Sequence, residues 1–305
     1  MNADKEWQGH KGSVLDSAGG FDVIECESCQ FKHIIPLPAP EELNQTYKSD
    51  YYLKEKPLYL ERHREDLEWW TLVYENWYSS LEKLLPANAR RILDVGSGPG
   101  FFLLHGKQKG WQTIGMEPSG QAAAHSRTLG LNIVEDFFTS KSVSGLGTFD
   151  VIHMSNVLEH VPNPTSIIEL AKETLNPNGL LFVVVPNDYS PFQSALRKAC
   201  GYAPWWVAPP HHVNYFDFDS LEKLLIQCGF NILERQTTFP IDLFLLMGEN
   251  YIGNDQLGRN CHEKRKTFEL NLHKAGLGQK VKDLYAKIAS LNIGREVVCI
   301  AQNSK

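Results

Sequence analysis

Short apolar runs alternate with amphipathic stretches from about residue 90 to the end of the chain. Near-continuous apolar runs are typical of buried parallel strands, and apolar residues spaced by three and four positions indicate helices. The expected strands cover residues 92–95, 111–116, 132–138, 149–154, 175–186 with its opening turn, 230–238 and 296–301. The expected helices cover residues 101–109, 165–175 and 217–228. This alternation predicts an α/β fold with buried parallel strands.

The stretch ahead of the first strand has helical periodicity. Its apolar stripe is formed by Leu67, Trp70, Val73, Trp77, Leu81 and Leu84. We therefore expect a leading helix over residues 61–86 that packs against the main domain. A stiff, proline-rich connector at residues 36–40 precedes it. The chain is accordingly divided into an N-terminal segment (1–60) and one domain (61–305) with insertions at 187–216 and 240–294.

A glycine-rich turn follows the first expected strand. Gly96, Gly98 and Gly100 let the chain turn sharply and bring bare backbone close to a ligand. Glu117 stands at the carboxyl end of the second strand. An acid at this place in a βαβ unit can accept hydrogen bonds from both ribose hydroxyls, so the turn and the acid together predict a nucleotide pocket.

The residues on either side of the glycines indicate which nucleotide is bound. The dinucleotide fingerprint G-x-G-x-x-G/A is broken here by Phe101 and Phe102, and Asp94 would repel a pyrophosphate but suit an ammonium group. This combination resembles motif I of the class I S-adenosylmethionine-dependent methyltransferases. The resemblance implies that Asp94 holds the methionine amino end of the cofactor, S-adenosyl-L-methionine, and that Glu117 holds its ribose. An ordinary tight turn with a surface acid is the structural alternative.

Further landmarks of the same family follow in order. Residues 155–161 resemble its "leEHv" segment, and residues 175–179 resemble its "LkPgG" turn. The resemblance implies a Rossmann-like, doubly wound sheet of seven strands in the order 3-2-1-4-5-7-6, with the last strand antiparallel. It also places the adenine near Asp136 and Phe137, although a plain turn acid is the alternative for Asp136. The expected cofactor contacts are Asp94, Gly96, Ser97, Gly98, Gly100, Phe101, Glu117, Pro118, Asp136, Phe137 and Asn156.

Methyl transfer to a hydroxyl or a carbon acid needs a general base, and histidine suits this task near neutral pH. His160 follows the fourth strand, and His212 lies in the insertion 187–216. Residues 210–216 resemble the "HEHxxYf" motif of deoxysugar C-methyltransferases, which implies that His212 is the base and that Tyr215 matches the motif's tyrosine. The alternative is that His212 and Tyr215 cap the next helix and that His160 is structural or faces the cofactor. The catalytic candidates are therefore His212, Tyr215 and His160.

Tyrosines gather just ahead of the leading helix, at Tyr47, Tyr51 and Tyr52. In the family that the chain resembles, such a leading segment often closes over the cofactor. We therefore hypothesise that one of these tyrosines covers the methionine end.

Cys26 and Cys29 form a C-x-x-C pair with strands expected on both sides. Two thiolates at this spacing can occupy two corners of a zinc tetrahedron, which His10 and His33 would complete. The segment resembles the N-terminal zinc-binding region of deoxysugar C-methyltransferases, but one of that region's cysteine pairs is missing. We therefore favour a metal-free hairpin over a structural zinc site, and a redox pair is favoured least because no thioredoxin-like context surrounds it.

A second place for a metal is the "ExxEH" pattern of some ubiquinone O-methyltransferases, which may bind a divalent ion through it. Asn156 replaces the first glutamate of that pattern and removes one charge. No metal is expected at either place.

The composition is that of a globular enzyme without a nucleic-acid or membrane signature. A net charge of −6 and the lack of a basic run give no electrostatic footprint for nucleic acid. The longest apolar stretch, residues 241–247, is far too short for a membrane span, and the N-terminus lacks the apolar core of a signal peptide. Six scattered cysteines favour a reducing, cytoplasmic setting. The expected partner is a small-molecule acceptor, and the oligomeric state is left open.

Three functions remain open at this point. The first is a small-molecule methyltransferase with a sugar or nucleotide-sugar acceptor, because the chain resembles methyltransferases of surface-polysaccharide and nucleotide-sugar pathways. The second is an O-methyltransferase acting on a phenol or quinone precursor. The third is a non-catalytic module that binds S-adenosylmethionine, or a dinucleotide enzyme, against which Asp94 and Phe101 argue.

Overall fold

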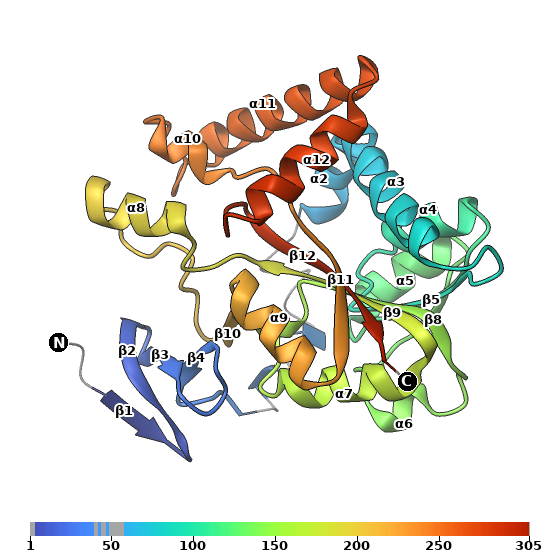
Figure 1. Ribbon diagram of the computed structural model, residues 1–305, viewed down its shortest axis with the longest axis horizontal. Helices are drawn as coiled ribbons and strands as arrows, with labels where there is room; N and C mark the ends of the chain where they lie inside the picture. The colour runs from blue at the N-terminus through green and yellow to red at the C-terminus, as the bar shows by residue number, and fades with distance from the viewer. Residues whose placement is uncertain (1–3, 40–41, 44–46, 49–57, 305) are drawn as a thin grey trace.

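The computed structural model describes residues 4–39, 42–43, 47–48 and 58–304 of the 305-residue chain. These residues form two sheets, the larger of which has seven strands at the centre of the molecule (Figure 1). In spatial order its strands are β11 (Phe230–Thr237), β12 (Glu296–Asn303), β9 (Leu175–Pro186), β8 (Phe149–Ser155), β5 (Arg91–Val95), β6 (Gln112–Met116) and β7 (Asn132–Val134).

The strand order and directions confirm the predicted sheet. Strands β5 to β9 run parallel, and β12 is antiparallel to both of its neighbours, β9 and β11. Numbered along the chain, this is the expected order 3-2-1-4-5-7-6 with a reversed last strand. One strand is shorter than expected. The sequence predicted a strand over residues 132–138, but β7 lies at the edge of the sheet and ends at Val134, where its pairing with β6 ends. Beyond it the chain turns toward α6 (Ser140–Val143), whose first turn Thr139 caps.

Helices cover both faces of the sheet, and side chains alternate along each strand to reach the two cores. Ile92 and Val151 pack in the same core as α3 (Leu67–Leu84) and α4 (Phe101–Gln108). Leu93 and Ile152 point the other way and pack in the core of α7 (Pro164–Thr174) and α9 (Phe218–Gln227). Burial on both faces explains why these strands read as continuous apolar runs. The crossover between β6 and β7 is α5 (Gly120–Thr128).

The leading segment forms two helices, α2 (Tyr59–Glu65) and α3, and not the single helix expected. They are divided at Asp66, which is buried and is bound by Arg259, His262 and Lys266 of α11 (Asp255–Lys274). Burial raises the pKa of Asp66, but the hydrogen bonds from Arg259 and Lys266 outweigh that effect and hold the pKa at about 2. A carboxylate bound across to another helix is a long-range contact that the periodicity of residues 61–86 cannot reveal.

The buried face of α3 also differs from the expected stripe. Leu67 is 53% exposed, whereas Trp69, Tyr74 and Tyr78 are buried. The reason is that α3 is covered on two sides, by the sheet and by α11, whose Glu269 accepts a hydrogen bond from Trp69 Nε1.

The insertion at 240–294 lies across the top of the view in Figure 1 and is helical. It contains α10 (Asp242–Leu246), α11 and α12 (Gly278–Ala289). Over the part of the chain that the structure describes, no helix has both the length and the apolar character needed to cross a bilayer.

The smaller sheet is built from the N-terminus and from one distant strand. Its order is β1 (Asp4–Trp7), β2 (His10–Ala18), β3 (Phe21–Cys26), β4 (Lys32–Ile35) and β10 (Asn214–Tyr215). The last of these follows α8 (Pro191–Cys200) in the insertion 187–216. The N-terminal strands are thus joined to the main domain by backbone hydrogen bonds and not only by the connector.

Candidate active site

A cavity of about 1130 Å³ opens where the parallel strands of the large sheet end. Ordinary ligand pockets measure about 300–1,000 Å³, so this cavity has room for more than one small molecule. All eleven residues predicted to contact the cofactor line it, and so do two of the three catalytic candidates, His160 and His212. The edge that holds the cavity is the one where ligands bind in open α/β sheets.

The glycine-rich turn has the backbone shape that the sequence predicts. Gly96, Gly98 and Gly100 have φ values of 69°, 53° and 85°, in the left-handed region that other residues avoid. Gly100 is the N-cap of α4, and no side chain caps that helix end. The turn therefore presents bare backbone and a helix N-terminus to the cavity.

Glu117 lies at the end of β6 and is buried with 5% of its surface exposed. Its carboxylate accepts hydrogen bonds from Gly98 N at 2.8 Å and from Ser119 N at 2.9 Å. Burial raises the pKa of Glu117 to about 7, the two N–H groups oppose that rise, and the charge of Asp94 adds to it. A carboxylate has about four acceptor positions, so two remain for ligand hydroxyls.

Asp94 is also buried at the cavity wall, and its Oδ1 lies 2.7 Å from His153 Nδ1. His153 comes from β8, the neighbouring strand, and its ring packs against Phe102 and Phe182. This contact with the imidazole orients the Asp94 carboxylate. Sequence reasoning missed His153, although a histidine inside an apolar strand beside Asp94 was a usable signal.

The remaining predicted cofactor contacts also line the glycine end of the cavity. Ser97 Oγ is buried at the cavity wall and has no hydrogen-bond partner among the described residues. Asp136 and Phe137 follow β7 and line the cavity, and Lys48 Nζ lies 5.5 Å from the centre of the Phe137 ring. Pro118 and Asn156 line the same wall.

An aromatic stack stands beside the glycine turn. The His63 ring lies parallel to Phe101 with 3.8 Å between centres, and it also stacks with Trp70. Burial lowers the pKa of His63 to about 4, so its imidazole is neutral and packs as an aromatic ring. Of the tyrosines considered as a lid, Tyr51 and Tyr52 fall outside the described residues, while Tyr47 and the later Tyr59 line the cavity.

The other end of the cavity is formed by histidines. His160 Nδ1 lies 2.8 Å from the carbonyl oxygen of His211 and 2.7 Å from the hydroxyl of Tyr47. A carbonyl oxygen only accepts, so Nδ1 carries the proton and Nε2 holds the lone pair in the neutral ring. The ring of His212 meets that of His160 edge-on, with 5.0 Å between centres.

Glu159 is a residue of this end that sequence reasoning missed. It is 1% exposed, it lines the cavity, and neither carboxylate oxygen has a hydrogen-bond partner among the described residues. Burial raises the pKa of Glu159 well above its usual range, and the nearby Asp188 adds to the rise. Its Oε1 lies 3.7 Å from His160 Nε2. Its place beside His160 in the "leEHv" segment was the available signal.

Tyr215 lies away from the cavity. It is fully buried in a core with Val23, Ile34 and Trp206, and its hydroxyl accepts a hydrogen bond from Ala208 N at 3.2 Å. The catalytic role predicted for Tyr215 has no support from this position, which is that of a packing residue. The resemblance of residues 210–216 to a catalytic motif cannot distinguish a tyrosine that faces the cavity from one that faces the N-terminal sheet.

Comparison with known proteins decides the family. A family model described as a methyltransferase domain matches residues 63–235, which is more than half of the chain. The chain belongs to the class I S-adenosylmethionine-dependent methyltransferases. The predicted fold, enzyme class and cofactor, S-adenosyl-L-methionine, are thereby confirmed.

The relatives differ in how much of each chain they match. The plantazolicin methyltransferase BpumL, solved in complex with SAH (S-adenosylhomocysteine), is 15% identical and covers 86% of this chain and 94% of its own, with a TM-score of 0.50. A ubiquinone biosynthesis O-methyltransferase of Agrobacterium fabrum is 25% identical over 176 residues, which are 55% of this chain and 70% of that protein. The same-named protein of Actinobacillus pleuropneumoniae serotype 7 is 36% identical over 103 residues, which are 30% of this chain and only 44% of that protein.

The residues at the glycine end of the cavity suit this cofactor. The buried Ser97 hydroxyl lacks a hydrogen-bond partner among the described residues, and Glu117 has acceptor positions left for hydroxyl groups. The carboxylate of Asp94 offers the negative charge that an ammonium group needs.

Proposed function

We propose that this methyltransferase acts on a small molecule that binds at the histidine end of the cavity, with a sugar or nucleotide sugar as the preferred acceptor. The observation that carries the proposal is the single cavity shared by the Asp94–Glu117 wall and the His160–His212 wall. An acceptor between the two walls faces the cofactor directly. Proximity and orientation are the main requirements of methyl transfer, because the reaction needs alignment more than activation.

The cofactor end has the following proposed roles. S-adenosylmethionine, when bound, supplies an activated methyl group on a sulfonium centre. Asp94 binds the ammonium group, and His153 holds Asp94 in place at 2.7 Å. Glu117 accepts from the ribose hydroxyls, while Asp136 and Phe137 lie beside the adenine.

At the acceptor end, His160 and His212 are the proposed bases. The carbonyl of His211 keeps the proton of His160 on Nδ1, which leaves the lone pair on Nε2. Glu159 is buried 3.7 Å from that nitrogen, and burial raises its pKa, which favours the neutral carboxyl. A neutral carboxyl does not hold the imidazole in its charged form, so His160 can both accept and release a proton.

A second acceptor class, a phenol or quinone precursor, is favoured by the names of two relatives and is compatible with the cavity lining. The relatives from Agrobacterium and Actinobacillus are named ubiquinone biosynthesis O-methyltransferases. The cavity is also lined by flat aromatic rings, among them Trp77 and Phe182. Aromatic faces suit flat acceptors and sugar rings alike, so the lining supports both classes.

The experiment is a transfer assay with two acceptor panels, one of sugars and nucleotide sugars and one of phenols and catechols. Formation of S-adenosylhomocysteine is measured, and the product is checked by mass spectrometry for one added methyl group. We expect turnover with a member of the sugar panel. Turnover confined to the phenol panel contradicts the preferred class, and an absence of turnover on both panels contradicts both proposed acceptor classes.

The bases are tested by His160→Ala and His212→Ala, with His105→Ala as the matched control. His105, in α4, lies outside the cavity lining and pairs with Glu75 of α3. Loss of the true base lowers kcat by roughly 10²–10⁴-fold and leaves binding of S-adenosylhomocysteine unchanged. Full activity in both variants rules out a histidine base.

A further inference from the structure

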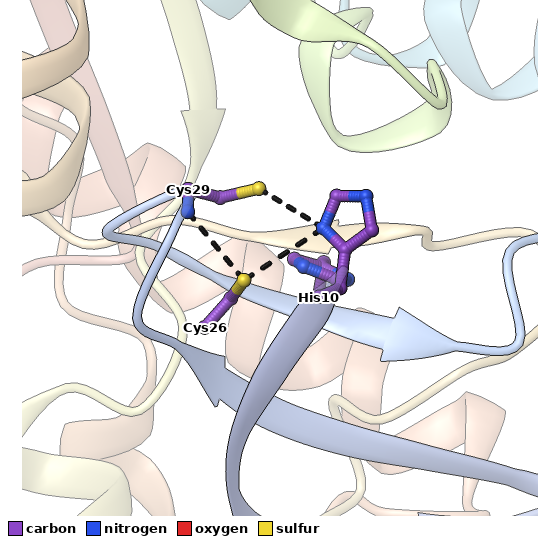
Figure 2. A group of neighbouring side chains, drawn as sticks. His10, Cys26 and Cys29 are labelled. Carbon is purple, nitrogen blue, oxygen red and sulfur yellow. Dashed lines mark hydrogen bonds between the residues drawn. The ribbon is translucent and has the colours of Figure 1, made fainter. Parts of the chain in front are cut away.

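Four side chains that can bind a metal meet at one end of the smaller sheet. They are His10 at the start of β2, Cys26 at the end of β3, Cys29 in the following turn and His33 in β4. Their ligand atoms all lie within 4.8 Å of one another. Figure 2 shows Cys26 and Cys29 directed at the ring of His10 from one side.

The distances within the group match one tetrahedral ion. His10 Nδ1 lies 3.7 Å from Cys26 Sγ and 3.3 Å from Cys29 Sγ. Zinc–sulfur bonds of about 2.3 Å and zinc–nitrogen bonds of about 2.0–2.1 Å require sulfur–nitrogen separations of about 3.5 Å in a tetrahedron. One nitrogen that lies this close to both sulfurs indicates a single ion, because in a cluster of the Rieske type the cysteines and the histidines bind different irons.

The second histidine is oriented as a metal ligand. His33 is 1% exposed, and its Nδ1 donates a hydrogen bond to the carbonyl of Ile34 at 2.9 Å. This places the lone pair on Nε2, which is buried and has no hydrogen-bond partner among the described residues. Metal-bound histidines usually donate their other nitrogen to a carbonyl or carboxylate in this way.

The turn that carries the two cysteines is shaped to present both sulfurs. Gln30 N donates to the Cys26 carbonyl at 2.9 Å, and Gln30 has a φ of 64°. Cys29 N points at Cys26 Sγ at 3.4 Å, which stabilises negative charge on that sulfur. Both cysteines are free thiols in the structure, so the pair is not a disulfide.

We propose that His10, Cys26, Cys29 and His33 bind one Zn²⁺ as a structural centre that ties the N-terminal hairpins to the acceptor end of the active site. Two thiolates and two imidazoles are a tetrahedral S₂N₂ set, which selects zinc. All four positions are filled by the protein, so the centre is structural. This replaces the metal-free hairpin that the sequence favoured. The missing second cysteine pair argued against zinc there, whereas the fold supplies two histidines instead.

The link to the active site runs through β10. His33 faces Asn214 in the register of β4 and β10, and Asn214 Nδ2 donates to the carbonyls of Leu158 and Val161. Val213 N donates to the carbonyl of Glu159 at 2.8 Å. The metal-bound strand is thus two hydrogen-bonded steps from Glu159 and its neighbour His160. The proposal goes beyond the transfer reaction and does not depend on it.

The first test is the metal content of the full chain, purified without chelators and measured by plasma mass spectrometry. We expect about one zinc per chain in the wild type and in Cys200→Ser, an exposed cysteine outside the group, and less than a tenth in Cys26→Ser/Cys29→Ser. Equal zinc in the double variant overturns the proposal, because the metal is then adventitious.

A second test uses the visible absorption spectrum of the wild type, so it does not depend on whether the double variant folds. Reduced, metal-free wild type is titrated with Co²⁺, which reports on zinc sites by its visible absorption. We expect an end point at one equivalent, with the bands of tetrahedral cobalt and of thiolate-to-cobalt charge transfer. If zinc is absent from the purified protein and Co²⁺ gives no such bands, the proposal is wrong.

The structural role is tested by hydrogen exchange with and without the metal. Removal of the metal is expected to speed amide exchange at Ile34 and Val213 by at least about tenfold. Ile34 N donates to the carbonyl of Val213, and Val213 N donates to the carbonyl of Glu159. Exchange in β5 and β6 and the affinity for S-adenosylhomocysteine should change less than about twofold. Unchanged exchange at Ile34 and Val213 overturns the link to the acceptor end. Metal content and exchange are read without turnover, so failure of the proposed reaction is a separate result.

Discussion

The two ends of the cavity are assembled in different ways. At the cofactor end, Gly98 and Glu117 lie 19 residues apart and belong to one βαβ unit. At the acceptor end, Tyr47 and His160 are separated by 113 residues, and His160 and His211 by 51. The first end is shaped by the backbone of adjacent strands, and the second forms only when distant segments dock on one another.

This difference has an energetic consequence. Residues of the cofactor end are part of the packed sheet, so changes there alter both folding stability and ligand binding. Residues of the acceptor end contact the sheet through side chains and short backbone bridges, so changes there should alter turnover with little loss of stability. The predictions below test this contrast, beginning with the largest expected effect.

The largest effect is expected for Gly100→Ala, with Gly110→Ala as the matched control. The two glycines have φ values of 85° and 87°, so alanine is strained at both by about 1–2 kcal/mol. A Cβ at Gly100 would also lie 2.6 Å from Leu131 Cδ1 and from Ser126 Oγ, whereas at Gly110 nothing lies within 4 Å. Urea unfolding should show a loss of about 3 kcal/mol or more for Gly100→Ala and about 1 kcal/mol for the control. Equal losses contradict close packing of the turn.

The next effect is the pH dependence of stability, tested with Glu117→Gln. The folded pKa of Glu117, about 7, is above its usual value of 4.5, so the folded state favours the protonated form. Its contribution to stability is fully present below pH 4.5 and is lost as the pH rises through about 7. Between about pH 5 and pH 8 the wild type should lose about 2 kcal/mol of unfolding free energy that the variant keeps. Parallel profiles for the two proteins would contradict this account.

Asp94→Asn should weaken binding of S-adenosylhomocysteine by about 10–30-fold, because it removes the charge that we propose to bind the ligand's ammonium group. The asparagine amide has nearly the same shape as the carboxylate of Asp94. The substitution therefore leaves the local packing nearly unchanged, and it changes mainly the charge and the contact with His153. The control is Glu135→Gln, an exposed acid that pairs with Arg127 outside the cavity lining. Titration calorimetry measures both, and equal affinities would show that Asp94 does not contact the ligand.

The smallest effect is expected for Tyr47→Phe at the acceptor end. His160 Nδ1 still donates to the His211 carbonyl without the tyrosine hydroxyl, so the imidazole keeps its proton arrangement. We expect kcat/KM to fall only a few-fold, corresponding to about 1 kcal/mol or less, with unchanged cofactor affinity and melting temperature. Tyr202→Phe, outside the cavity lining, is the control. A loss of a hundredfold or more would show that the Tyr47 hydroxyl takes part in proton transfer.

The same contrast explains what the sequence could predict. The strand order and the cofactor wall follow from local patterns: apolar runs, glycines that require a positive φ, and an acid at a strand end. The break at Asp66 depends on Arg259 and Lys266 of α11, nearly 200 residues away, and no local pattern contains that information. Tyr215 was placed by its motif but faces the N-terminal core. His33 and His10 were considered as ligands, but only the register of β2, β3 and β4 shows that they meet Cys26 and Cys29.

The most direct test of the central claim is calorimetric titration of the wild-type chain with S-adenosylhomocysteine and, separately, with NAD. The cavity wall of Asp94, the glycine turn and Glu117 predicts one S-adenosylhomocysteine per chain and a melting temperature that rises with its concentration, as mass action requires. NAD should give neither heat nor a shift. Binding of NAD without binding of S-adenosylhomocysteine would contradict the assignment of this wall to the cofactor.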